Sequence, residues 1–283
     1  MTNARMLIVN DFDDAELSLI AGGEVGSLPL SHLQVYSNSR HYRSTNTNEV
    51  QLTLTWQQPR ILSGCALRRH NMSSSSTWRI EVFKDTALTD VGYDSNNLWP
   101  TGKPAIEQKT LGELEWLVDP LVAKAVDAKY QDSDIWFDTQ LAHGVRITLN
   151  DPDNVPGFID LSRIYIGRAL QPRVNFSYGH TMGWLANPNK KKRSMGGTAF
   201  GKKAAKPREL KFALKHLNEQ DRPHFVNAIN LLDETTDWYV SMFPGAGGQK
   251  ERHYAMACQF EVLPKFEGNF YNNFLSDYHL VEA

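Results

Sequence analysis

The sequence lacks the features that mark a membrane protein or a disulfide-stabilised domain. It has only two cysteines, Cys65 and Cys258, which lie far apart and in apolar, strand-like surroundings. Such cysteines favour buried thiols over a disulfide, and a reducing compartment as the place of synthesis. No apolar run approaches the roughly 18 residues that span a bilayer, and Met6–Val9 is too short for the core of a signal peptide. We therefore expect a soluble protein made in the cytoplasm, with no membrane insertion.

An excess of charge and the common catalytic motifs are also missing. The formal net charge is −2, so the whole chain exerts no general attraction on nucleic acid or membrane. GxSxG, HExxH and CxxC do not occur, and GGTAFGK lacks the spacing of a phosphate-binding loop. The nine histidines are dispersed, and only His41, His70 and His143 share a predicted domain with plausible acids. Glu113 and Glu115 are interpreted as solvated side chains on a helix surface, so we expect no enzymatic activity.

Short alternations of apolar and polar residues predict that the chain consists mostly of β-strands. Pro59 is expected to end the strand that contains Leu52, Leu54 and Trp56. The predicted strands are Met6–Val9, Leu52–Trp56, Val145–Leu149, Phe158–Ile166, Leu210–Leu214, Trp238–Phe243, Tyr254–Val262 and Phe270–Val281.

The segment Leu62–Asp85 is predicted to form a central strand–turn–strand hairpin. Its second arm alternates regularly, because Trp78, Ile80 and Val82 are apolar while the residues between them are charged. The polar segment between the arms, HNMSSSS (70–76), has the composition of a turn. The tip of this hairpin is the first candidate for a ligand or subunit contact.

Helices are predicted at two places. Asp221 resembles an N-cap and Pro223 lies in the first turn, with Phe225, Ile229 and Leu232 as the buried stripe. Leu111–Ala128 also has roughly helical spacing, but Pro120 divides it into two short pieces at most. Residues 21–33 and Gly245–Gly248 are expected to be a loop or extended arm and a flexible turn.

The length and a change of composition near residue 172 indicate two domains. We predict a mainly β fold, with an N-terminal arm and first strand over residues 1–50 and a β-sandwich over 51–172. Residues 173–283 are predicted to form a smaller strand-rich domain with one helix. This domain contains the basic loop 187–208, which holds eight Lys or Arg and no acidic residue. Such a segment is expected to be mobile until it meets a partner.

Several phrases occur in an order that resembles phage tail and baseplate proteins with a galactose-binding-like (discoidin-type) jelly roll. They are ALRRHNMSSSSTWRIEVF (66–83), YDSNNLWP (93–100), VRITLNDPDNVPGFIDLSRIYIG (145–167) and RSMGGTAFGKK…PRELKFAL (193–214). The arm LPLSHLQVYSNSRHYRS (28–44) is also similar. One departure is Asn96, where a glycine is expected after Asp94-Ser95; asparagine tolerates left-handed geometry, so the turn can survive. The basic loop is also longer and more charged than that family's pattern.

The resemblance implies a galactose-binding-like jelly-roll domain in a bacteriophage virion component similar to distal tail proteins. Such a protein would form a homo-oligomeric ring in the tail tip or baseplate and contact the tail tube, hub and tape measure. It would be synthesised in the host cytoplasm. The alternative is a carbohydrate-binding module that attaches the particle to host surface glycans.

A sugar site is one reading of His70 and Asn71 at the hairpin tip, with Trp99 as its aromatic platform. The structural alternative is favoured: Asn71 would close the turn and His70 would bond a neighbouring strand. Sugar sites need several converging polar groups, and most tryptophans of a β-rich protein belong to its core.

Asp151, Asp153 and Asn154 resemble a loop that binds a hard cation, because their oxygens are closely spaced. The glycine and distal glutamate of an EF-hand are missing, so a plain turn is favoured. No cofactor is expected; if an ion binds, the resemblance implies structural calcium.

The basic loop offers Lys190, Lys191, Lys192, Arg193, Lys202 and Lys203 for an interaction. Phosphate contacts through it would be salt-dependent and independent of base sequence. Only Phe200 could stack on bases, so nucleic acid is disfavoured. We expect the loop to order against an acidic neighbouring subunit; bacterial surface polyanions are a further candidate partner.

Overall fold

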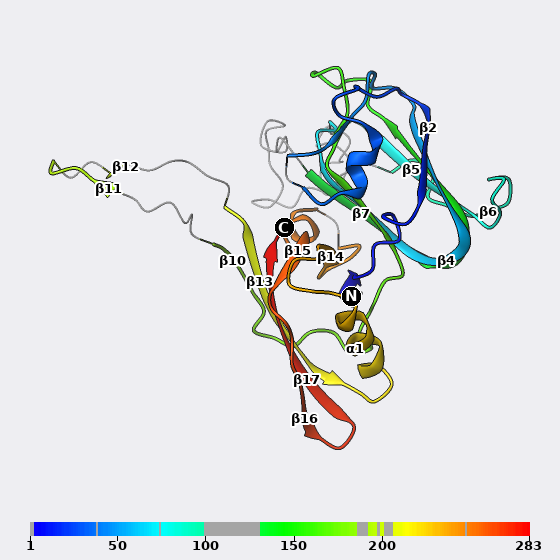
Figure 1. The fold of residues 1–283 in the computed structure, drawn as a ribbon. Helices are drawn as coiled ribbons and strands as arrows, with labels where there is room; N and C mark the ends of the chain where they lie inside the picture. The colour runs from blue at the N-terminus through cyan, green and yellow to red at the C-terminus, as the bar shows by residue number, and fades with distance from the viewer. Residues whose placement is uncertain are drawn as a thin grey trace, which may run out of the picture. The chain divides into compact units, whose positions relative to one another are not determined.

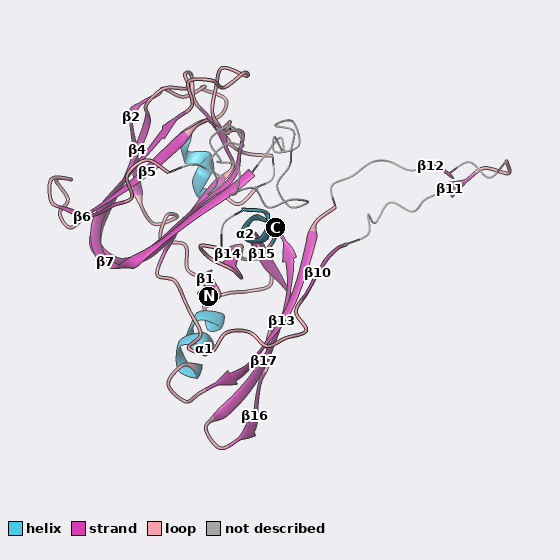
Figure 2. Ribbon diagram, turned by 180° about the vertical axis from the view of Figure 1, so that it is seen from behind, coloured by secondary structure: helices cyan, strands magenta, loops and turns pink. Residues whose placement is uncertain are grey.

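The structure is a computed structural model that describes residues 3–37, 39–73, 75–98, 131–185, 192–196, 199–200, 206–246 and 248–283. Strands dominate these residues (Figure 2), which confirms the predicted mainly β fold. The chain divides into two compact units. Unit 1 comprises Met1–Gln171 and Trp238–Met256, and unit 2 comprises Pro172–Asp237 and Ala257–Ala283. None of the helices in the described part of the chain is long and apolar enough to cross a membrane.

Unit 1 is a β-sandwich built around two long antiparallel strands, β4 (Val50–His70) and β7 (Gln131–Asn150). The first half of β4 lies in a layer with β2 (Glu16–Ala21), the end of β7, β5 (Thr77–Phe83) and β6 (Val91–Asp94). Its second half pairs with the start of β7 and with β9 (Arg163–Gly167). The pairing shifts register between Thr55 and Arg60, and both long strands curve strongly in Figure 1. Bulges bend a strand pair in this way.

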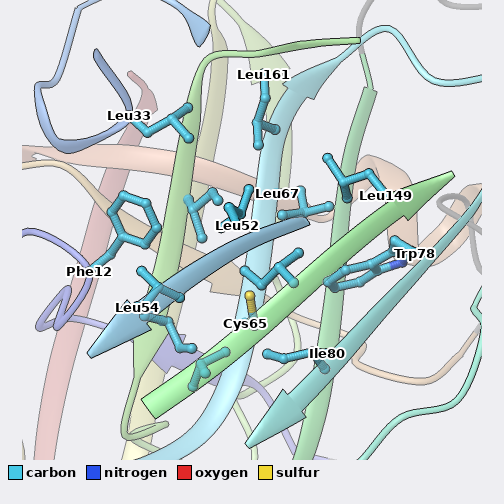
Figure 3. Close-up of a cluster of buried hydrophobic side chains, with 14 of the residues drawn as sticks. Phe12, Leu33, Leu52, Leu54, Cys65, Leu67, Trp78, Ile80, Leu149 and Leu161 are labelled. Carbon is cyan, nitrogen blue, oxygen red and sulfur yellow. The ribbon is translucent and has the colours of Figure 1, made fainter. Parts of the chain in front are cut away.

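The two halves of the long strands close over one hydrophobic core. Leu52 and Leu54 come from the first half of β4, and Cys65 and Leu67 come from the second half. Figure 3 shows these side chains gathered with Trp78, and all are essentially inaccessible to water. Burial of one such large apolar side chain contributes about 1.5–3 kcal/mol, so this core is the main stabilising element of unit 1. The predicted buried state of both thiols is confirmed, because Cys65 and Cys258 are free and buried.

The predicted hairpin over Leu62–Asp85 is wrong. Both strands exist, but β4 and β5 do not pair, because β7 lies between them in the sheet. The polar segment after His70 instead connects the second half of β4 to β5, and so crosses from one layer of the sandwich to the other. We call it the crossing segment. The expectation for Pro59 is also wrong, since β4 continues through it. Pro59 falls in the stretch without ladder partners, where its missing N–H costs no hydrogen bond.

The N-terminal 50 residues belong to unit 1. β1 (Arg5–Leu7) pairs with β14 (Trp238–Ser241), and β3 (Tyr42–Arg43) pairs with β8 (Asp160–Leu161). Of the loop predicted over 21–33, residues 22–29 connect β2 to a 3-10 helix, η1 (Leu30–Gln34). The last four residues of the predicted loop are therefore helical, and Leu30 and Leu33 are buried. The Val25 N–H donates to the carbonyl of Arg43 at 3.0 Å. The described part of this arm is therefore packed within unit 1.

The turn around Asn96 keeps the geometry that its sequence permits. Asn96 has φ +54°, and its N–H donates to Asp94 Oδ1 at 2.8 Å. The same carboxylate is held by Arg79 of β5, whose Nε donates to Asp94 Oδ1 at 2.8 Å. Asparagine thus replaces the glycine expected at this position.

Unit 2 is a sheet in which β13 (Arg208–Leu217) lies between β10 (Thr181–Trp184) and β17 (Asn273–Glu282). The other edge of β17 pairs with β16 (Phe266–Phe270) and, further along, with residues 258–262 of β15 (Ala255–Val262). Leu210, Phe212 and Leu214 are buried, which confirms the predicted strand. Phe212 stacks on Tyr278 with ring centroids 4.9 Å apart. The short strands β11 (Lys192–Arg193) and β12 (Ala199–Phe200) pair with each other.

The helices and the C-terminal strand differ in detail from expectation. The predicted helix is α1 (Arg222–Asn230), but only Phe225 of its stripe is fully buried, and Asp221 makes no side-chain cap bond. A second helix, α2 (Gly248–His253), begins where a flexible turn was expected. The predicted strand Phe270–Val281 is interrupted, because Tyr271 and Asn272 form the turn between β16 and β17. The helix predicted over Leu111–Ala128 lies outside the described residues.

Candidate functional site

His70, the first predicted contact residue, lies inside unit 1 with 0% of its surface exposed. Its Nε2 is 2.7 Å from the Ser133 hydroxyl of β7. Burial, with a smaller contribution from the positive charge of Arg252, lowers the His70 pKa to about 3. His70 is therefore neutral near pH 7 and inaccessible to a ligand in solution, which removes it from the candidate contact residues. The hydrogen bond between His70 and Ser133 is the structural alternative predicted for His70 from the sequence.

Asn71 ties the crossing segment to the loop before β8. Its Nδ2 donates to the carbonyl of Phe158 at 2.9 Å, and its Oδ1 accepts from the N–H of Asp160 at 2.8 Å. Both ends of the carboxamide are thus used by the backbone of one opposing loop. In this arrangement Asn71 closes a loop, as the structural alternative proposed.

The Asp151–Asn154 turn uses its oxygens in the same way. Asp151 is buried, and its carboxylate accepts from the N–H of Ser73 and from Asn154 Nδ2, both at 2.8 Å. The Ser73 hydroxyl donates to the other oxygen of Asp151, and Asp153 accepts from Ser75 at 3.0 Å. No group of three or more His, Cys, Asp or Glu side chains that could hold a metal ion occurs within the described ranges. The turn anchors the crossing segment through hydrogen bonds.

Several predicted site residues fall outside the described part of the chain. Trp99 does so, as do Lys190, Lys191, Lys202 and Lys203. Only the backbone of Lys192 and Arg193 is described, as β11.

Unit 1 has a polar groove of about 500 Å³ where β4 bends. Arg60 lies over it, 3.1 Å from Asp14 and 3.5 Å from Asp11. Burial raises the pKa of Asp11 to about 6, although Arg60 opposes the shift. Trp56 lines the groove but is almost fully buried and donates its indole N–H to the Asp11 carbonyl at 2.8 Å. The groove can donate and accept hydrogen bonds, and it is lined by Asp14, Glu16, Thr55, Trp56, Gln57, Gln58, Arg60 and Thr86.

Unit 2 has a larger groove, of about 690 Å³, over the polar face of its sheet. Ala213, which pairs with Asp277, lies in the centre of the groove. Because the side chain of Ala213 is small, it leaves a hollow between the longer side chains of its neighbours. The apolar lining comes from Ala213 and from Tyr178, Val262, Leu263 and Leu275, while Lys211, Lys215, Lys265, Glu267, Asp277 and His279 supply charged or titratable groups. We call this the unit 2 groove.

One end of the unit 2 groove carries an ion network. Glu209 Oε1 lies 2.8 Å from Lys211 Nζ and 2.5 Å from His279 Nε2. The hydrogen bond from Lys211, followed by that from His279, lowers the pKa of the Glu209 carboxyl. The carboxylate therefore fixes the two basic side chains on neighbouring strands.

Exposed aromatic side chains are confined to unit 2 among the described residues. Tyr178 is 102% exposed, Trp184 62%, Phe270 80% and Tyr271 101%. The large apolar residues exposed on the described surface of unit 1 are all aliphatic. Among the described residues, the exposed aromatic side chains therefore belong to unit 2.

The sequence contained part of the signal for the unit 2 groove. If Leu210, Phe212 and Leu214 face the core, then Lys211, Ala213 and Lys215 must face away from it. What the alternation does not contain is the partner strand: Lys211 lies opposite His279 and Ala213 opposite Asp277, more than sixty residues later. The groove follows from that long-range register.

No family model matches the sequence, and no curated protein matches it. Solved structures do match. One is chitosan-binding module 1 of a chitosanase/glucanase from Paenibacillus sp. IK-5, at 12% identity and TM-score 0.40, covering 56% of this chain and 99% of that chain. Others are the family 32 CBM from C. perfringens NanJ, at 12% identity and TM-score 0.37 over 58% and 98%, and a Streptococcus pneumoniae fucose-binding module, at 8% identity and TM-score 0.37 over 56% and 98%.

Proposed function

We propose that this protein is a non-catalytic structural component of a bacteriophage tail tip or baseplate, assembled as an oligomeric ring that contacts other tail proteins. The observation that supports the proposal best is the concentration of exposed aromatic residues on unit 2, including Tyr178, Trp184, Phe270 and Tyr271. Aromatic side chains are enriched in protein interfaces.

The family resemblance stated for residues 66–83, 93–100, 145–167 and 193–214 gives the proposal its biological setting. The basic loop adds a second candidate contact, since eight cations without an acid favour association with an acidic surface. Location in the virion is part of the same proposal.

Co-purification tests this function. The tagged full chain, expressed with the tail-tube and hub proteins encoded beside it, should recover at least one of them as a complex that survives gel filtration. A chain that stays monomeric and elutes apart from every one of these proteins contradicts the proposal.

A second candidate function is carbohydrate binding by unit 1 for attachment to host glycans. Within this chain it is supported by the unit 1 groove, where carboxylates, carboxamides and a guanidinium converge. Such groups recognise the hydroxyls of a sugar. The solved structures with similar folds include modules described as binding chitosan, galactose and fucose.

A glycan array followed by calorimetry tests the second candidate. Binding should weaken on Gln57→Ala or Gln58→Ala if the groove is the site, and on Trp99→Ala if the predicted platform is the site. Glu267→Gln, on unit 2, is the matched control and should leave sugar binding unchanged. An array without a signal for the wild-type chain rejects carbohydrate binding.

A further inference from the structure

We propose that the aromatic turn of the β16–β17 hairpin, Phe270 and Tyr271, docks into the unit 2 groove of a second copy of this chain. The inference deepens the proposed function, on which it rests, by naming the contact that joins neighbouring subunits.

The turn of this hairpin exposes two aromatic rings to solvent, where a partner can contact them. Phe270 pairs with Asn273, so Tyr271 and Asn272 form a two-residue turn, with Asn272 at φ +56°. Asparagine tolerates this left-handed conformation, and the strand pairing shifts register beside the turn, between Gly268 and Phe270. Figures 1 and 2 both place this turn at the free end of β16 and β17. Phe270 and Tyr271 thus lie at the end of a hairpin and are 80% and 101% exposed.

The unit 2 groove offers a matching surface. The hollow above Ala213 is bordered by Val262, Leu263 and Leu275, which provide aliphatic contacts for an aromatic ring. Tyr178 stands fully exposed at its rim and can stack with an incoming ring. Burial of large aromatic side chains in such a pocket is the usual source of binding energy at an interface.

Charge favours this occupant over a charged one. From Gly268 to Ser276 the hairpin reads GNFYNNFLS and contains no charged residue. The groove carries three lysines and two carboxylates around its lining. A neutral turn brings no charge of its own into the groove, and the carboxamides of Asn269, Asn272 and Asn273 can donate to its carboxylates and accept from its lysines.

The geometry excludes a fold-back of the same chain. Neither Phe270 nor Tyr271 lines the groove of its own chain. The short turn has no slack with which to reverse. Because each copy offers one turn and one groove at different places on the same unit, the contact is head-to-tail, which generates rings if the rotation closes.

Inter-copy cross-linking tests the contact directly. One chain carries Tyr271→Cys and a second, of different tag mass, carries Ala213→Cys. The native thiols do not compete, because Cys65 and Cys258 are buried. Under mild oxidation we expect a disulfide-linked heterodimer of the two chains. The control pair replaces Tyr271→Cys with Leu231→Cys, which lies on unit 2 at the end of α1 and is 70% exposed; this pair should give only background product.

Loss of self-association provides an independent measurement. Phe270→Ser with Tyr271→Ser should leave the thermal unfolding midpoint unchanged, because both side chains are exposed. The variant should raise the dissociation constant for self-association by about 30-fold or more, and Leu231→Ser should not.

Equal cross-linking by both cysteine pairs, or unchanged self-association of the double serine variant, overturns the inference. If the chain still co-purifies with tail proteins in that case, the proposed function stands and only this contact is wrong. A double serine variant that self-associates normally but loses binding to a tail protein, a glycan or vesicles assigns the turn to that partner and also overturns the inference.

Discussion

At the scale of single residues, the polar side chains of the predicted tip serve the fold. His70 through its Nε2, Asn71 through its carboxamide and Asp151 through its carboxylate form hydrogen bonds with a neighbouring strand or loop. Their types and turn-like composition were visible in the sequence, and the structural alternative already assigned Asn71 to the turn. The burial of His70 was not visible, because it depends on residues far along the chain, among them Ser133 and Arg252.

The His70 pKa predicts an acid-sensitive stability. The folded state holds the imidazole neutral with a pKa of about 3, whereas the unfolded chain protonates near 6.5. Protons therefore bind the unfolded state preferentially, and the free energy of unfolding should fall by about 3 kcal/mol between pH 6.5 and pH 4.

Urea unfolding of the wild-type chain and of His70→Gln across this range isolates the effect. Glutamine does not titrate, so the difference between the two proteins should shrink as the pH falls. Parallel pH profiles for the two chains would refute the assignment.

The Asp151 network predicts stability that does not depend on calcium. Asp151→Asn removes the negative charge and one of the two oxygens that accept from the Ser73 N–H, the Ser73 hydroxyl and Asn154 Nδ2, and should lower the free energy of unfolding by about 2 kcal/mol. Asp153→Asn, at an exposed carboxylate, should change it by less than about 0.5 kcal/mol.

Thermal unfolding with EDTA and with added calcium checks this prediction. The midpoints of the wild-type chain should agree in the two conditions. A midpoint that calcium raises in the wild-type chain but not in Asp151→Asn would instead establish a cation site at this turn.

At the scale of elements, local alternation predicts strands but not their neighbours. Trp78, Ile80 and Val82 are buried as the period of two indicates, yet β5 pairs with β7 rather than with β4. Strand pairing depends on contacts between residues far apart in sequence, which a local pattern does not contain. The continuation of β4 through Pro59 has the same origin, since it depends on where the β4–β7 ladder is interrupted.

The close approach of β4 and β7 gives an element-scale prediction. A Cβ at Gly64 would lie 2.5 Å from Trp136 Cε3. Trp136 is held by an indole bond to Asp134 and by Arg5 over its ring, so it has little freedom to move. Gly64→Ala should therefore cost about 1–3 kcal/mol of unfolding free energy.

The matched control is Gly26→Ala, whose Cβ would have no neighbour within 4 Å. Denaturant unfolding monitored by tryptophan fluorescence compares the two variants. Equal stabilities would mean that Trp136 is not fixed over Gly64.

At the scale of the whole molecule, the two units have different surfaces. The described surface of unit 1 presents exposed apolar residues that are aliphatic, together with a polar groove, whereas unit 2 presents exposed aromatics and a groove able to receive them. Composition indicated two parts to the chain. It could not indicate that residues 238–256 join unit 1, because that depends on the pairing of β14 with β1.

The mass of the particle that the full chain forms is the most direct test of an assembly role. Sedimentation velocity over a concentration series, alone and with the tail-tube and hub proteins, measures it. Our account predicts a discrete oligomer of fixed stoichiometry, alone or in the mixture, seen as a ring by negative-stain imaging. A single species at the 32.1 kDa of one chain in every mixture would contradict it.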